Sequence, residues 1–102
     1  MSATDDAILR SIFDVYDLCD AAGGCLHIVV DDGNMERDDI EWSVRWGRVI
    51  ESESGNYTFA PACPVCKKCA DLLLSVGEED RERLYCAFHA MSWEQQAALG
   101  ES

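Results

Sequence analysis

The chain has 102 residues, of which 48% are hydrophobic and 27% are charged, and this composition indicates a folded domain rather than a disordered tail. Twenty acidic residues against eight basic ones give a net charge of -12. Nucleic-acid phosphates are bound through Lys and Arg, so direct nucleic-acid binding is disfavoured and a basic protein surface is the natural partner. We expect one compact domain spanning residues 1–102.

The sequence carries no pattern of export or membrane insertion. Its apolar runs are only a few residues long, whereas a membrane-spanning helix needs about 20. The first residues, MSATDDAILRS, include acids where a signal peptide carries basic residues. We therefore expect a cytoplasmic protein, in a reducing compartment where its six cysteines stay free or bind metal.

The N-terminal part begins with a clear helical pattern. Residues 5–20 predict an amphipathic helix, because apolar side chains recur on one face and acids on the other. Its expected N-cap is Thr4, and Gly23 with Gly24 is expected to end it. The run CLHIVV, residues 25–30, is short and rich in β-branched residues, and it predicts a buried strand that ends in a turn at DDGN.

Residues 38–51 are compatible with two structures. Alternating apolar residues from Ile40 to Trp46 suit a strand, whereas a pair resembling a capping box and a narrow polar stripe favour the helix that we expect. In either structure Trp42 and Trp46 share a face, and paired tryptophans of this kind usually belong to the core.

The C-terminal part predicts one short strand and three helices. The segment YTF, residues 57–59, is expected to pair with the strand at 25–30, and helices are expected over residues 62–76, 77–90 and the closing WEQQAAL. The expected capping boxes are Ser75 with Glu78, and Ser92 with Gln95. The predicted fold class is α+β and mainly helical, with about four helices packed around one short strand or a two-stranded hairpin.

Two close pairs of residues suggest a zinc site. Cys63 and Cys66 are separated by two residues, as are Cys86 and His89, and four such ligands make a closed tetrahedral structural site. A second, less regular set consists of Cys19, Cys25 and His27.

The cysteines around residue 66 have another interpretation, as part of the core. On a helical wheel Cys63, Cys66 and Cys69 fall together with Leu73, and a free cysteine in such a place behaves as a small buried hydrophobe. We favour this interpretation, with no cofactor and no metal. Zinc stays the alternative, because Cys86 lies off the apolar face of its own helix.

Acidic residues are concentrated in the first part of the chain: residues 1–41 contain eleven acids and two bases, a net charge of -9. They lack the ligand spacing of a calcium loop, and the sequence contains no phosphate-binding loop or nucleophile motif. We therefore assign no catalytic residue and expect a protein that is not an enzyme. The candidate partner-binding residues are Asp14, Asp17, Asp20, Asp31, Asp32, Glu36, Asp38, Asp39 and Glu41.

The segment GGCLHIVVDDGN, with a helix before it and ADLLLSVGEEDRERLY after it, resembles a family of small acidic proteins encoded by bacteriophages and prophages. The resemblance extends over most of the chain, and its most specific part is LHIVVDDGN. It implies an accessory protein made in a bacterial cytoplasm and assigns no catalytic residues. The CPVCKKC run lies outside the shared pattern.

In that setting, our first hypothesis is an inhibitor that acts by binding. Its acids would occupy a basic nucleic-acid-binding surface of a host protein as a nucleic-acid mimic, as an anti-CRISPR or another counter-defence protein would. The alternative is a zinc-stabilised protein–protein adaptor that contacts its partner through Trp42 and Trp46. A metal-dependent hydrolase using the aspartates is a third possibility. The protein is expected to be a monomer or a homodimer.

Overall fold

Helices make up most of the computed structural model, which describes residues 2–19 and 24–101. Within these residues, six helices and two strands follow in the order α1–α2–α3–β1–β2–α4–α5–α6. The helices are α1 (Ala3–Leu18), α2 (His27–Asp32), α3 (Arg37–Trp46), α4 (Pro64–Leu74), α5 (Glu78–Ala90) and α6 (Trp93–Leu99). The strands are β1 (Arg48–Glu51) and β2 (Tyr57–Ala60). The prediction of a mainly helical α+β fold is confirmed.

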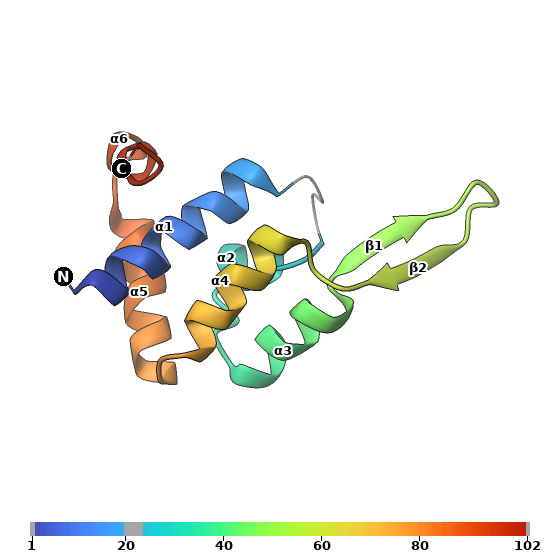
Figure 1. Cartoon of the computed structure of the whole chain (residues 1–102), viewed down its shortest axis with the longest axis horizontal. Coiled ribbons are helices and arrows are strands. Elements are labelled where there is room, and N and C mark those ends of the chain that lie inside the picture. The colour runs from blue at the N-terminus through green and yellow to red at the C-terminus, as the bar shows by residue number, and fades with distance from the viewer. Residues whose placement is uncertain (1, 20–23, 102) are drawn as a thin grey trace.

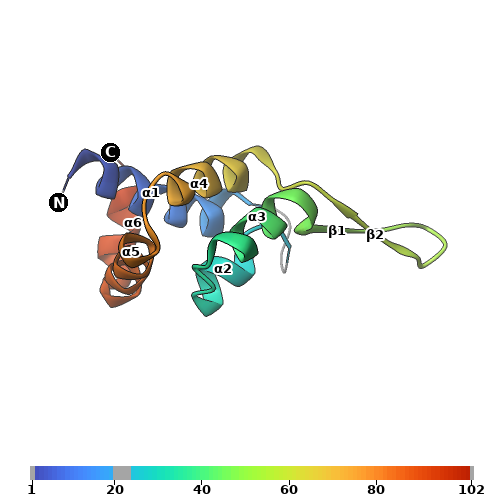
Figure 2. The same ribbon diagram turned by 90° about the horizontal axis from the view of Figure 1, so that it is seen from below.

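The helices form a body from which the hairpin of β1 and β2 projects, as Figures 1 and 2 show. The projection makes the molecule long and flat, with extents of 48 × 27 × 20 Å. The core lies among α1, α2, α3, α4 and α5, and none of its buried members comes from the hairpin. Its fully buried large side chains include Ile8, Leu9, Ile12, Leu26, Val29, Val30, Leu73, Leu84 and Phe88.

Helix α1 begins two residues earlier than the sequence predicts. The Ser2 side chain, rather than Thr4, accepts a hydrogen bond from the Asp5 backbone N–H at 3.1 Å and so caps the first turn. The helix ends at Leu18, and Cys19 already has extended backbone. The predicted stop at Gly23 lies outside the described residues.

The predicted strand at 25–30 is wrong, because His27–Asp32 is helix α2. Gly33 ends this helix with φ of 72°, a left-handed conformation that costs glycine little, and its N–H donates to the Val29 carbonyl. Val29 and Val30 are buried in the core, so tertiary packing prevails over the β-propensity of these residues.

The segment predicted at 38–51 divides into a helix and a strand. Helix α3 takes its first part, as expected, and β1 its last four residues. Strand β2 pairs with β1 and not with residues 25–30, in the antiparallel register Val49↔Phe59 and Ile50↔Thr58. Trp42 and Trp46 are not core residues, since 52% and 43% of their surfaces are exposed.

The three C-terminal helices match the prediction, with one difference in capping. Ser92 and Gln95 form the predicted capping box at the start of α6. Ser75, by contrast, ends α4, where its hydroxyl donates to the Leu72 carbonyl at 2.6 Å, and Gly77 is the N-cap of α5.

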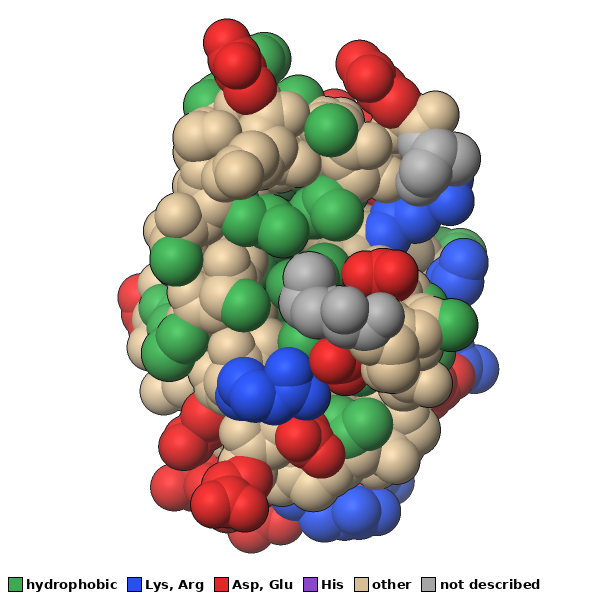
Figure 3. Space-filling view, turned by 90° about the vertical axis from the view of Figure 1, so that its left-hand side faces the viewer, with side chains coloured by type: hydrophobic (Ala, Val, Ile, Leu, Met, Phe, Trp, Pro, Cys, Tyr) green, Lys and Arg blue, Asp and Glu red, His purple; other side chains and the backbone are tan. Residues whose placement is uncertain are grey.

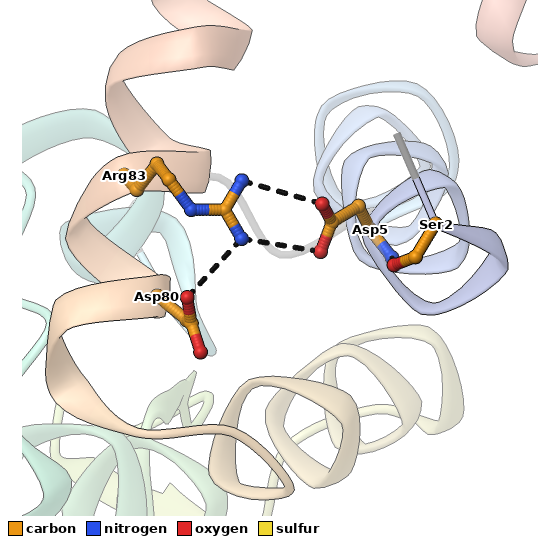
Figure 4. Close-up of polar contacts among 4 residues, drawn as sticks. All are labelled: Ser2, Asp5, Asp80 and Arg83. Atoms are coloured by element: carbon orange, nitrogen blue, oxygen red, sulfur yellow. Dashed lines mark hydrogen bonds and ion pairs between the residues drawn. The ribbon is translucent and has the colours of Figure 1, made fainter.

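Two arginines of α5 hold the helices together in different ways. Arg83 forms ion pairs with Asp5 of α1 and Asp80 of α5, each at 3.2 Å (Figure 4). Arg81 is only 5% exposed and donates to backbone carbonyls, including those of Met35 at 2.8 Å and Val76 at 2.7 Å. Arg81 therefore ties the α2–α3 connection to the α4–α5 connection. No helix in the described part of the chain has the length and apolar character needed to cross a membrane.

Candidate metal centre

Four thiols from two distant segments meet beside the root of the hairpin. The Sγ atoms of Cys19, Cys25, Cys63 and Cys66 all lie within 4.8 Å of one another, the one such group among the described residues. Cys25 and Cys66 are buried, and Cys19 and Cys63 are half-buried. All four are free thiols. The fold thus brings together four cysteine thiols that have limited access to water.

Local structure explains how each pair of cysteines reaches the cluster. Cys63 is the N-cap of α4 and Cys66 lies in its first turn, with Pro64 at a position where the missing N–H costs little. Cys19 follows the last residue of α1, and Cys25 has φ of 52°, a left-handed conformation that is uncommon outside glycine. This backbone directs the second pair toward the first.

Gly47 allows the Cys25 segment to approach the hairpin. The N–H of Cys25 donates to the Gly47 carbonyl, and Gly47 immediately precedes β1. A Cβ atom at Gly47 would lie 2.7 Å from the carbonyl oxygen of Cys25, closer than real contacts permit. A glycine is required here because the two backbones meet.

The spacing of the sulfurs suits a tetrahedral metal ion. Zinc–sulfur bonds are about 2.3 Å long, so four ligands at the corners of a tetrahedron lie about 3.8 Å apart. The Sγ atoms of Cys19 and Cys63 are 3.6 Å apart, and the largest separation in the cluster does not exceed 4.8 Å. Four thiolates in this arrangement are typical of zinc or iron, not of magnesium or calcium.

Backbone groups already point at the sulfurs. The N–H of Cys63 donates to Cys25 Sγ at 3.4 Å, the kind of contact that supports metal-bound thiolates. Burial opposes ionisation of Cys63, yet the pKa of its thiol is lowered because Cys66 and other neighbours donate hydrogen bonds to it. Burial raises the pKa of Cys25 and of Cys66. The Cys63 thiol thus loses its proton more easily than a free cysteine, and a cation would stabilise the others as thiolates.

The structure replaces two members of the predicted zinc set. Cys86 is exposed on α5, and His89 Nε2 lies 2.8 Å from the Val30 carbonyl, so neither belongs to the cluster. The reason is packing: α5 turns Leu84 and Phe88 into the core, and this directs Cys86 to solvent. The companions of Cys63 and Cys66 are Cys19 and Cys25, which the sequence offered only as a second set with His27.

Cys69 shows that the core interpretation of α4 was partly correct. It is fully buried with Ala70 and Leu73, as the helical wheel predicts, and burial raises the pKa of its thiol to about 12. The one-face pattern therefore contains both core residues and members of the cysteine cluster. Cys19 and Cys25 were offered by the sequence only in a less regular set with His27, because a sequence does not show which cysteines meet in the fold.

The predicted partner-binding acids do not all lie in one place. Asp31, Asp32, Glu36, Asp38 and Asp39 are all exposed at the end of α2 and the start of α3, close together in the chain. Of the others, Asp17 is exposed on α1, Glu41 pairs with Arg37 at 2.9 Å, and Asp20 lies outside the described residues.

Asp14 lies apart from the five exposed acids at the end of α2 and the start of α3. It is half-buried on α1 and lines a groove of about 630 Å³ together with Arg10 and Lys68. On the end of the molecule that carries the N-terminus, Figure 3 shows acidic side chains mixed with basic and hydrophobic ones. The negative charge therefore does not form a continuous surface on this end of the molecule.

The comparisons with known proteins are negative. No protein-family model, curated protein or solved structure matches this chain.

Proposed function

We propose that this protein is a zinc-stabilised protein-interaction module. The observation that carries the proposal is the convergence of Cys19, Cys25, Cys63 and Cys66 within 4.8 Å. Four cysteine ligands fill a tetrahedral zinc site and leave no position for a substrate, which is the pattern of structural rather than catalytic zinc. The proposed role of the metal is to hold the fold.

The place of the cluster supports a role in presenting the hairpin. Cys63 follows β2 by three residues, and the Cys25 N–H bonds to Gly47, the residue before β1. Both strands thus emerge beside the proposed metal. An isolated two-stranded hairpin is only marginally stable in water. A zinc ion bound by the cysteines at its base would therefore favour one orientation of the hairpin.

The surface that would be presented is unusually apolar. We call it the arm surface, and it consists of Trp42, Trp46, Val49, Tyr57 and Phe59, each at least 43% exposed. Val49, Tyr57 and Phe59 share one face of the hairpin, because Val49 is paired with Phe59 and side chains alternate along a strand. Trp42 and Phe59 pack edge to face with ring centroids 6.2 Å apart, so helix and hairpin contribute to one patch. Exposed aromatic patches of this kind mark interaction sites.

Metal content tests the proposal. Purified protein should contain one zinc per chain, and cobalt substitution should give the intense thiolate-to-metal absorption of a four-cysteine site. Cys19→Ser should weaken the cobalt spectrum strongly, whereas Cys86→Ser should leave it unchanged. Iron in place of zinc, or equal effects of the two variants, would contradict the assignment.

A second candidate function follows from the exposed acids at the α2–α3 connection. We propose that, if the protein is an inhibitor of the kind implied by the phage resemblance, these five acids contact the basic surface of the host protein. Association with such a surface should weaken as salt rises. Reversing Asp31, Asp32, Asp38 and Asp39 to lysine should abolish it, and binding indifferent to both changes would sink this candidate.

A further inference from the structure

We propose that β2 pairs with β2 of a second copy of this chain, giving a four-stranded antiparallel sheet across a two-fold axis. The inference rests on the proposed function in one respect, since it identifies the partner of the arm surface. It is carried by three properties of the hairpin: its unpaired edge, its sequence and its charge.

The outer edge of β2 is open, because the sheet formed by the described residues has only the order β1–β2. Ser52 donates to the Asn56 carbonyl, which sets the alternation of hydrogen bonds along the hairpin. In that alternation Thr58 bonds to Ile50 of β1, and the N–H and C=O groups of Tyr57 and Phe59 point outward. Four backbone groups on this edge are available to another strand.

The residues of β2 do not protect this edge. Exposed edges are usually blunted by charges, proline or bulges, but Tyr57, Thr58, Phe59 and Ala60 include none of these within the strand. Strand β1, by contrast, has Arg48 and Glu51 at its two ends. Strand β2 is therefore the edge on which pairing is expected.

The outward groups select one register. In this register Tyr57 of each copy pairs with Phe59 of the other, and each pair forms two backbone hydrogen bonds, four in all. The two Thr58 residues then lie opposite each other. Aromatic and threonine pairs are both favourable across strands. The aromatic rings of the two copies would then join into one face that also includes Trp42, which already contacts Phe59.

The charge distribution permits the association. Residues 42–60 contain two arginines and two glutamates, so their net charge is zero, and the -12 of the chain lies elsewhere. Antiparallel pairing places the acidic bodies at opposite ends of the paired strands. Their separation exceeds the strand length of about 13 Å, beyond the Debye length of about 8 Å at physiological salt.

Sedimentation of zinc-loaded protein over a wide concentration range tests the pairing. We expect a dimer that becomes stronger as salt rises from about 0.01 M to physiological concentration, because the acidic bodies lie within the Debye length only at low salt. Phe59→Pro removes an outward N–H and should weaken the dimer about a hundredfold beyond Phe59→Ala, which keeps that N–H. A monomer at every concentration, as expected if the arm binds another protein, would overturn the proposal, as would equal dimerisation of the two variants.

The register has its own test. In a Cys86→Ser background, Thr58→Cys should form an intermolecular disulfide on mild oxidation, since opposed residues of a non-hydrogen-bonded pair lie within disulfide range. Ser54→Cys at the hairpin tip should not. Zinc content is measured on the same samples: full zinc without a dimer rejects the pairing alone, whereas absent zinc rejects the metal proposal. Equal cross-linking of both cysteine variants would contradict the register.

Discussion

The Sγ atoms of Cys19 and Cys63 lie 3.6 Å apart although 44 residues separate them in the chain. The contact joins the end of α1 to the start of α4 at the root of the hairpin. We expect removal of the proposed zinc by a chelator to lower the midpoint of thermal unfolding by more than about 10 °C. Cys86→Ser should retain this difference and Cys19→Ser should lose it. Identical midpoints with and without chelator would be inconsistent with a structural metal.

Arg81 offers a prediction about stability that is independent of the metal. Its buried guanidinium donates to backbone carbonyls, and Arg81→Met would take this donor from the carbonyls of Met35 and Val76. We expect the free energy of unfolding to fall by about 3 kcal/mol, measured in urea. The matched variant Arg83→Met removes only ion pairs of a half-exposed side chain, which water screens, and should cost much less. Equal losses for the two arginines would refute the role given to burial.

Gly47 links the hairpin to the cysteine cluster, so one methyl group should disturb both. Gly47→Ala places a Cβ against the Cys25 backbone and should cost about 2 kcal/mol and weaken cobalt binding. Gly77→Ser is the control, because nothing lies within 4 Å of its Cβ position and serine is a good N-cap. An unaltered cobalt affinity in Gly47→Ala would show that the close approach does not position Cys25.

Tyr16 should make stability sensitive to alkaline pH. Its hydroxyl donates to the Val30 carbonyl at 2.8 Å, and burial, followed by the nearby Asp31, raises its pKa above the ordinary value of 10. The folded state therefore holds this proton more tightly than the unfolded state. Its contribution is complete below pH 10 and is lost as the pH rises above that value. Above pH 10 the free energy of unfolding should fall more steeply with pH for the natural protein than for Tyr16→Phe. Parallel curves for the two proteins would contradict this.

The periodic patterns predicted most helices correctly. The pattern of α4 held because lysines and core residues are separated around one helix, and the capping box of Ser92 and Gln95 held because it is a contact between neighbours in the chain. The pattern failed at α2, where Val29 and Val30 suit a strand by propensity but pack in the core as a helix. Local patterns predict structure where local energies dominate.

The sequence by itself determined the helical fold class, the acidic charge and the pairing of Cys63 with Cys66 in one turn of helix. Only the tertiary structure decided that Cys19 and Cys25 complete the cluster, that Cys86 faces solvent and that the tryptophans stay exposed. The physical reason is that a ligand set depends on distances between side chains far apart in the chain. Those distances are set by how α1, α4 and α5 pack, which no spacing along the sequence encodes.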